Sequence, residues 1–247
     1  MGLTEASQLA VVDREPLTRP RVTLSFAQSL DGSISAVRGR SLNLSGRESL
    51  EFTHRMRAGH EAILVGIGTV LADNPQLTVR LVSGQSPRPV ILDSRLRTPA
   101  NSAFLKDHEQ TPLLIAVRPV DPYRRSALES AGAEILPMPA DGQGRVDLPS
   151  LLHSLEMIGV KSLMVEGGAA VITSFLLGRL VDRLSVTIAP ALVGGTRSIE
   201  QLLSFGPVGP SGDGEYSMER FPRLEGLEVE RAGQDLILSG DIRWGNS

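Results

Sequence analysis

The stretch Gly66–Arg80, GIGTVLADNPQLTVR, decides how this part of the chain can fold. It follows the apolar run Ala62–Val65, AILV, which is typical of a buried strand. Two glycines one residue apart then fit the start of a dinucleotide fingerprint, but Leu71 occupies the position of its third glycine. Asn74-Pro75 also ends the helix early, because a proline disfavours α conformation in the residue before it. The stretch therefore predicts a strand, a short helix and an abrupt change of direction, which is not a standard Rossmann turn.

Short apolar runs alternate with amphipathic stretches from Arg21 onward. The apolar runs predict strands within residues 21–28, 61–66, 88–94, 111–117, 134–138, 161–168, 182–195 and 234–244. The amphipathic stretches predict helices within 45–60, 121–133, 147–160 and 169–180, with Ser45 as the N-cap of the first. This alternation predicts an α/β fold with a mostly parallel central sheet and helices on both faces. No helix separates the last strands, so we expect an antiparallel C-terminal edge.

Composition limits the classes of protein to consider. The 247 residues suffice for a loosely ordered extension, 1–20, and a single domain, 21–247. A net charge of −3 without a dense basic run argues against nucleic acid or anionic membrane as a partner. The sequence shows no cysteine, no secretory signal and no apolar run of ~20 residues, so we expect a cytoplasmic protein. The Gly/Pro-rich segment 205–217 is expected to be a mobile surface loop.

A second pair of glycines lies in Glu166–Ser174, EGGAAVITS. The pattern predicts that a strand ends at Glu166, that Gly167 and Gly168 turn the chain, and that a helix begins at once. Bare backbone N–H groups at a helix N-terminus form an anion site, and the pyrophosphate of a nucleotide is its natural ligand. Because this arrangement is common, it suggests a nucleotide without identifying one. The four histidines lack metal-ligand spacing, and we expect no metal site.

Several single residues have a structural interpretation beside a functional one. Asp93 lies at about the distance expected of a ribose-binding acid. Gly66 and Gly68 can instead permit close packing of a strand on a helix. Asp31-Gly32 is, on its own, a turn signal.

Five stretches of the chain carry a more specific signal when taken in order. They are SLDGSIS (29–35), MRAGHEAILVGIGTVLADNPQLTVR (56–80), VILDSRLRTP (90–99), VEGGAAVITSFL (165–176) and VDRLSVTIAPALVGG (181–195). Together they resemble the pyrimidine reductases of riboflavin biosynthesis, which also form the C-terminal half of a bacterial bifunctional deaminase/reductase. The resemblance covers residues 21–244. It implies a dihydrofolate reductase-like fold, NADPH as the cofactor and a homodimer.

The reaction implied by the resemblance reduces a ribosylaminopyrimidine 5′-phosphate to its ribitylamino counterpart. The ribosyl ring opens to an imine, and the nicotinamide delivers hydride to C1′. The sequence leaves two substrates open, the diaminopyrimidinone before deamination and the aminopyrimidinedione after it.

The resemblance also assigns the cofactor-binding positions. Ala27 matches a backbone contact at the nicotinamide end, Asn43, Thr69 and Asp73 match further cofactor contacts, and Ser94 matches a contact at the adenosine 2′-phosphate, near Arg95 and Arg97. Bacterial members often have an aromatic residue in place of Asn43. The pyrophosphate-binding turn corresponds to Gly167, Gly168, Ala169, Ala170, Val171, Ile172, Thr173 and Ser174.

Substrate positions follow in the same way. The family pattern assigns substrate contacts to Ser41, Arg57, Leu77, Arg80 and Glu166. Arginines suit the 5′-phosphate because a guanidinium offers a planar, bidentate fork. Ser25 stands where some members carry a lysine proposed to assist the chemistry, so we assign catalysis to Asp73 and Glu166 as candidate proton donors, acting directly or through water.

Two competing hypotheses remain at this stage. One is a paralogous reductase of a pterin, a folate or another small substrate, which would oxidise NADPH with dihydrofolate. The other is a non-catalytic nucleotide-binding module, which would bind NADPH without turnover. Arg57 and Arg80 favour a phosphorylated substrate over the first, and the joint presence of Arg57, Asp73, Arg80 and Glu166 argues against the second.

Overall fold

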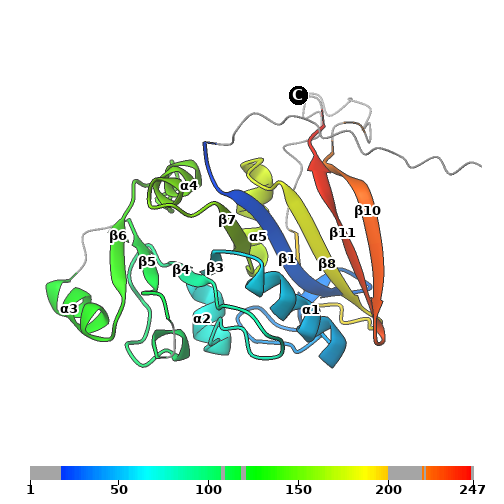
Figure 1. Cartoon of the computed structure of the whole chain (residues 1–247), viewed down its shortest axis with the longest axis horizontal. Helices are drawn as coiled ribbons and strands as arrows, with labels where there is room; N and C mark the ends of the chain where they lie inside the picture. Colours follow the sequence, from blue (N-terminus) through cyan, green and yellow to red (C-terminus); the bar gives the residue numbers. More distant parts are fainter. Residues whose placement is uncertain (1–17, 107–108, 118–120, 200–218, 220, 246–247) are drawn as a thin grey trace, which may run out of the picture.

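A nine-stranded sheet forms the centre of the molecule (Figure 1). The computed structural model describes residues 18–106, 109–117, 121–199, 219 and 221–245. The strand order is β10-β11-β8-β1-β7-β3-β4-β5-β6. Its strands are β1 (Arg21–Ser29), β3 (Ala62–Gly66), β4 (Arg88–Leu92), β5 (Leu113–Ala116), β6 (Glu134–Pro137), β7 (Ser162–Val165), β8 (Arg183–Ala189), β10 (Arg223–Ala232) and β11 (Asp235–Arg243). A separate short pair consists of β2 (Ser33–Ser35) and β9 (Thr196–Arg197).

The direction of the strands agrees with the sequence prediction. Every pairing from β8 through β1, β7, β3, β4 and β5 to β6 is parallel. β11 is antiparallel to β8, and β10 is antiparallel to β11. The expected α/β fold, with a mostly parallel sheet and an antiparallel C-terminal edge, is therefore confirmed.

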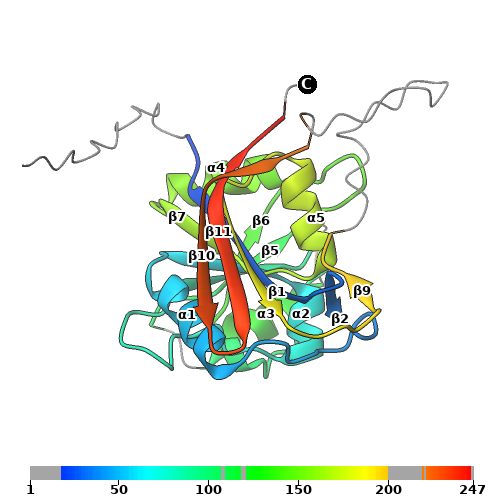
Figure 2. The same cartoon turned by 90° about the vertical axis from the view of Figure 1, so that its right-hand side faces the viewer.

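Helices cover both faces of the sheet, as expected. They are α1 (Arg47–Ala58), α2 (Ile67–Asp73), α3 (Pro122–Ser130), α4 (Leu148–Met157) and α5 (Ala169–Leu177), with a 3-10 turn η1 (Ala103–Leu105). Alternate residues of β3 enter two apolar clusters: Leu64 joins the cluster of α4 and α5, whereas Val65 joins that of α2 and α3. Figure 2 shows α1 and α5 on opposite sides of the sheet.

The short helix α2 ends where Asn74-Pro75 predicts. Asn74 is the C-cap and adopts the left-handed backbone conformation, with φ of 42°. Gly66, at the start of α2, is required by packing, because a Cβ there would lie 2.8 Å from Cγ2 of Val171 on α5. Gly68 faces open space. The close-packing interpretation is thus confirmed for Gly66 and is wrong for Gly68.

The start of α1 differs from the prediction by one residue. Gly46 is the N-cap, not Ser45, and no local side chain caps the helix. Asp235, at the start of β11, instead accepts hydrogen bonds from the Gly46 N–H (2.8 Å) and the Ser49 hydroxyl (2.5 Å). Because this partner lies far away in the sequence, local capping rules could not identify it.

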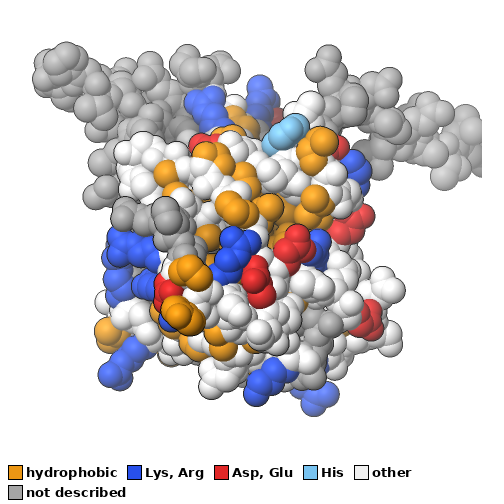
Figure 3. Space-filling view, turned by 90° about the vertical axis from the view of Figure 1, so that its left-hand side faces the viewer, with side chains coloured by type: hydrophobic (Ala, Val, Ile, Leu, Met, Phe, Trp, Pro, Cys, Tyr) orange, Lys and Arg blue, Asp and Glu red, His pale blue; other side chains and the backbone are white. Residues whose placement is uncertain are grey.

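The two edges of the sheet differ. At the β6 edge, Glu134 forms an ion pair with Arg88 of β4 at 2.7 Å, and charged side chains mix with apolar ones over that side (Figure 3). β10, at the other edge, was not among the expected strands, although Leu227 and Val229 alternate with glutamates. Nine of its ten residues are at least partly exposed. β10 is therefore an edge strand that is open on both faces.

Parts of the sequence prediction fall outside the described residues. Residues 1–17 of the expected extension and the expected loop 205–217 belong there, so the division into an extension and a single domain remains a prediction. Within the described part of the chain, none of the helices has the length and apolar character needed to cross a membrane.

Candidate active site

β1 and β7 pair only over the first part of β1. Pairing of these strands runs from Arg21–Ser162 to Leu24–Val165, whereas β1 stays paired with β8 as far as Ser29. The segment after Leu24 therefore has no β7 neighbour. Ligands of α/β sheets bind outside the carboxyl ends of strands, where neighbouring chains part. We call the space between residues 25–29 and residues 166–168 the opening.

Four of the expected cofactor residues lie in a row along this edge. Ala27 lies on β1, Gly168 follows β7, Thr69 follows β3 and Ser94 follows β4, in the order of the strands themselves. Neighbouring strands are about 4.8 Å apart, so the row spans about 14 Å from β1 to β4. Thr69 directly faces the Gly–Gly turn, because a Cβ on Gly168 would lie 3.9 Å from its hydroxyl oxygen. The row has the length and direction to hold an extended molecule.

The Gly–Gly turn can bind a ligand only through its backbone N–H groups. Gly168 is the N-cap of α5, and its carbonyl accepts hydrogen bonds from the N–H groups of Val171 and Ile172. The N–H groups of the first turn before Val171 have no carbonyl within the helix to bind. Ile172 is fully buried and Ala169 is buried, while Val171 packs against Gly167. Of the expected segment 167–174, the N-terminal backbone is therefore the part with free N–H donors for an anion, and the roles of the other residues remain predictions.

Arg57 and Glu166 form the centre of the site. The Arg57 guanidinium donates from Nε and Nη2 to the two carboxylate oxygens of Glu166, both at 2.7 Å, and from Nη1 to the Thr78 carbonyl at 3.2 Å. Burial disfavours the charged guanidinium, but the charge and hydrogen bonds of Glu166 outweigh burial and raise the pKa of Arg57. The structure thus joins two predicted substrate residues that come from α1 and from the end of β7.

Arg80 lies beside this pair. Its backbone N–H donates to Nδ1 of His54 at 2.9 Å, and its guanidinium donates to the Thr78 hydroxyl at 2.9 Å. Burial and the nearby charge of Arg57 lower the pKa of Arg80. Glu166 pairs with Arg57, and no described ion pair neutralises Arg80. The resulting net positive charge favours an anionic group in this place.

The remaining predicted residues are not joined to this cluster in the described structure. Ser41, Asn43 and Asp73 are exposed, and no described hydrogen bond or ion pair connects them to Arg57, Arg80 or Glu166. Leu77 has a left-handed backbone (φ 59°) and a side chain that is 2% exposed within the core. Leu77 can therefore contact a substrate only through its backbone.

Asp31 has a role that the turn signal did not reveal. Its carboxylate accepts hydrogen bonds from the hydroxyls of Ser29 and Ser33, at 2.7 and 2.6 Å. It also accepts from the N–H groups of Val193 and Gly194, at 2.8 and 2.9 Å. These donors, those of Ser33 and Ser29 first, lower the pKa of Asp31. Asp31 ties the turn after β1 to the loop after β8, next to the opening.

Asp93 does not face a ligand. Its side chain is fully buried, and Oδ2 accepts hydrogen bonds from the N–H and the hydroxyl of Thr98, both at 2.7 Å. The interpretation of Asp93 as a ribose-binding acid is therefore wrong. Its neighbour Ser94 is half-buried, and Arg95 and Arg97 are exposed.

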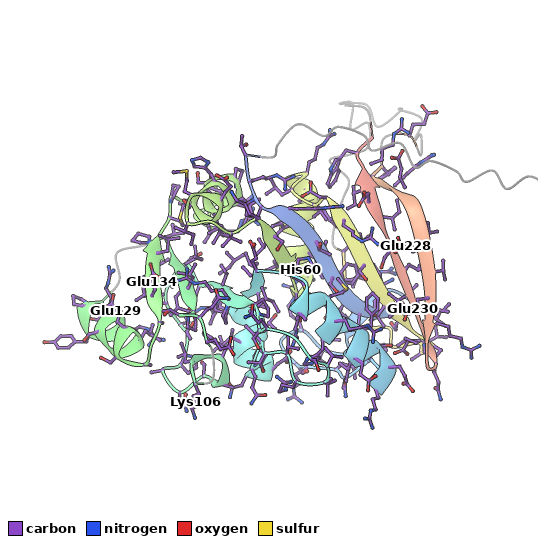
Figure 4. All side chains as sticks on the ribbon, in the orientation of Figure 1. His60, Lys106, Glu129, Glu134, Glu228 and Glu230 are labelled. Atoms are coloured by element: carbon purple, nitrogen blue, oxygen red, sulfur yellow. The ribbon has the colours of Figure 1, made fainter. Side chains whose placement is uncertain are left out.

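A second hollow, of about 260 Å³, lies on the α1 face between α1 and strands β8, β10 and β11 (Figure 4). His60, Glu228 and Glu230 line it. Its polar groups mostly satisfy one another: His60 Nε2 lies 2.9 Å from the Thr23 hydroxyl, and Arg183 pairs with Glu228 at 2.7 Å. We interpret this hollow as a polar packing layer. No group of three or more metal-ligating side chains occurs among the described residues.

The fold and the site define an α/β protein in which Arg57, Arg80 and Glu166 come together at the carboxyl edge of a mostly parallel sheet. The chain belongs to the family described as the RibD C-terminal domain, whose model matches residues 20–238.

Curated relatives of similar length agree with this assignment. The chain is 39% identical over 228 residues to the 2,5-diamino-6-ribosylamino-4(3H)-pyrimidinone 5′-phosphate reductase of Methanothermobacter thermautotrophicus, covering 91% of this chain and 99% of the relative. It is 40% identical over 190 residues to the Archaeoglobus fulgidus protein of the same name, covering 73% and 84%.

Solved structures share the fold. RibD of Acinetobacter baumannii matches with a TM-score of 0.74 at 26% identity, covering 92% of this chain and 59% of that one. The Saccharomyces cerevisiae riboflavin biosynthesis reductase Rib7 matches with a TM-score of 0.66 at 29% identity, covering 93% of each chain.

The lowered pKa of the buried His54 predicts that the stability of the fold depends on pH. Burial first, and then the charges of Arg57 and Arg80, lower its pKa from 6.5 to about 4. Because the folded-state pKa lies below the ordinary value, protons bind the unfolded chain more tightly, and stability is lost as pH falls from about 6.5 towards 4. We expect the free energy of unfolding in urea to drop by on the order of 1–3 kcal/mol across this window.

The matched variants are His54→Asn, which keeps an acceptor for the Arg80 N–H, and His153→Asn at an exposed position. The first should lose less stability between about pH 7 and about pH 4.5 than the native chain, and the second should behave like it. An identical loss in all three proteins would show that His54 does not carry the effect.

Proposed function

We propose that this protein is an NADPH-dependent reductase of riboflavin biosynthesis, acting in the cytoplasm on a ribosylaminopyrimidine 5′-phosphate. The observation that carries the proposal is the meeting of Arg57, Arg80 and Glu166 beside the Gly167–Gly168 turn. Two arginines beside the carboxyl ends of parallel strands suit a phosphorylated substrate and a dinucleotide together.

The cofactor residues follow the row along the opening. NADPH, when bound, supplies the hydride. The backbone of Ala27 would hold the nicotinamide end, the N-terminus of α5 the pyrophosphate, and Ser94 the adenosine 2′-phosphate. Thr69 supports this arrangement because it faces Gly168 across the row. The exposed Asp73 and Asn43 would contribute at its margin.

The substrate residues Arg57 and Arg80 lie around Thr78, and Arg57 joins them to Glu166 at the end of β7. Arg80 is exposed and donates only one described side-chain hydrogen bond, so its guanidinium is the more accessible clamp for the 5′-phosphate. Arg57 mainly orients Glu166, whose carboxylate would accept from a hydroxyl or ring N–H of the substrate. Ser41 and the backbone of Leu77 would complete the contacts. These groups would hold C1′ of the opened sugar against the nicotinamide.

Asp73 and Glu166 are the candidate donors of the proton to the substrate. Arg57 donates to both oxygens of Glu166, so this carboxylate is an acceptor in the present arrangement. Donation by Glu166, directly or through water, would require the ion pair to open and the carboxylate first to take up a proton. Asp73 forms no described ion pair, and it would donate the proton from its position at the end of α2.

The diaminopyrimidinone is the substrate we favour. The relatives at 39–40% identity are both named for the 2,5-diamino compound and match most of their length. The bifunctional RibD relatives are less similar, at 32% identity for the Aquifex aeolicus protein, which the chain covers over 57%.

We also propose a homodimer, which the open edge of the sheet supports. Leu227, Val229 and Leu236 project from one face of β10 and β11 and are 56%, 61% and 43% exposed. Exposed apolar side chains on an open edge strand favour association. Light scattering should give twice the 26.4 kDa chain mass, and Val229→Asp should lower it. A single-chain mass for the native protein would contradict the homodimer.

Replacing Arg80 tests the assignment of the substrate pocket. Arg80→Ala should raise KM for the pyrimidine phosphate about 10- to 100-fold, because a charged hydrogen bond is worth about 1.5–3 kcal/mol. The dissociation constant for NADPH, measured by fluorescence titration, should stay nearly unchanged. Equal losses for substrate and cofactor would contradict the phosphate clamp.

Gly168→Val is the complementary variant. An added Cβ has room in the free protein, 3.9 Å from the Thr69 hydroxyl, but the valine side chain would occupy the place proposed for the pyrophosphate. NADPH affinity should fall while the melting temperature changes little. Normal NADPH binding would show that the turn is not the pyrophosphate site.

A further inference from the structure

The loop after β4 is held in an unusual shape. Leu96 at its centre has a left-handed backbone, with φ of 47°. Asp93 closes the loop from one end, because its carbonyl accepts from the Leu96 N–H at 2.9 Å and its carboxylate accepts twice from Thr98. A leucine in this conformation needs support from its surroundings.

Arg124 supplies support from the outside. It lies in the first turn of α3, and its guanidinium donates from Nε to the Leu96 carbonyl and from Nη2 to the Thr98 carbonyl at 3.4 Å. One side chain from another element therefore holds the two carbonyls that flank Arg97. Arg124 is exposed, and replacing it removes no core packing.

The loop also carries unbalanced positive charge. Arg95 and Arg97 are exposed, and neither they nor Arg124 forms an ion pair within the described part of the chain. The neighbouring carboxylate, Asp93, is fully buried and turned into the loop towards Thr98. On α3, Glu129 pairs with Arg125 at 2.9 Å, and the Asp121 carboxylate caps the helix at the Tyr123 N–H. Ser94 is therefore followed by two exposed arginines, Arg95 and Arg97, that no described carboxylate neutralises, while Arg124 holds the loop that carries them.

We propose that Arg124 is a positioning residue that sets the preference of this enzyme for NADPH over NADH. By fixing the carbonyls of Leu96 and Thr98, it holds Ser94, Arg95 and Arg97 in the conformation that receives the adenosine 2′-phosphate. The inference rests on the proposed binding of NADPH with its 2′-phosphate at Ser94. NADH lacks that phosphate, so its binding depends little on the shape of the loop.

The test compares Arg124→Met with Arg125→Met. Both substitutions remove one positive charge from adjacent exposed positions of α3, but only Arg124 contacts the loop. Dissociation constants are measured by fluorescence titration for NADPH and NADH, and by calorimetry for adenosine 2′,5′-bisphosphate and AMP. Arg124→Met should weaken NADPH and the bisphosphate about 10-fold, as expected for loss of a charged hydrogen bond, and leave NADH and AMP within about 2-fold. Arg125→Met should change none of them.

Arg124→Lys adds a rescue arm. A lysine keeps the charge but offers a single ammonium in place of the planar fork, so it should recover only part of the preference. An Arg124→Met protein that retains the full NADPH preference, or that loses NADH and NADPH equally, would overturn the inference. If the native protein itself shows no preference for NADPH, the proposed cofactor fails, and this result is distinct from the previous one.

Discussion

The site depends on the point at which β1 and β7 stop pairing. Their ladder ends at Leu24–Val165, while β1 continues beside β8 for five more residues. If β7 continued, it would cover the backbone of Ala27 and carry the Gly–Gly turn away from α2. Because it stops, the carboxyl ends of β1, β7, β3 and β4 present their following residues in one row. The tight contact of Gly66 and Gly167 with Val171 holds α5 against the end of β3 beside that row.

The charges of the pocket follow from the Arg57–Glu166 pair. A partly buried guanidinium is costly unless it is paired, and the two 2.7 Å hydrogen bonds provide that pairing. The pair orients Glu166 and leaves Arg80 as the uncompensated cation. His54 completes the balance because, with a pKa of about 4, it is neutral at pH 7 and accepts the Arg80 N–H without adding a third positive charge.

The local features of the fold could be predicted from the sequence. Apolar runs placed the central strands, and Asn74-Pro75 placed the end of α2, because both effects act over a few residues. β10 was missed although Leu227 and Val229 alternate with Glu228 and Glu230, which is a strand signal that charge obscured. The N-cap of α1 was placed on Ser45 because the true partner, Asp235, comes from the far end of the chain.

In the site, too, local features could be predicted and contacts between distant residues could not. The order and spacing of the motifs identified Arg57, Arg80 and Glu166 as candidate substrate residues. No local rule could show that Arg57 and Glu166, which are 109 residues apart in the sequence, bind each other. Likewise, Asp31 signalled only a turn, because its donors at Val193 and Gly194 lie in a distant loop. Leu77 matched a substrate position of the family. Its burial could not be predicted, because it depends on packing against α2 and β3.

We propose that the residues around this opening bind a ribosylaminopyrimidine 5′-phosphate and a nicotinamide cofactor for reduction of the sugar. The most direct measurement is turnover of the purified protein with the diaminopyrimidinone phosphate and, separately, the aminopyrimidinedione phosphate, each with NADPH and with NADH. We predict oxidation of NADPH with formation of the ribitylamino product, fastest with the diaminopyrimidinone. Oxidation of NADPH with dihydrofolate but with neither pyrimidine phosphate would contradict the account.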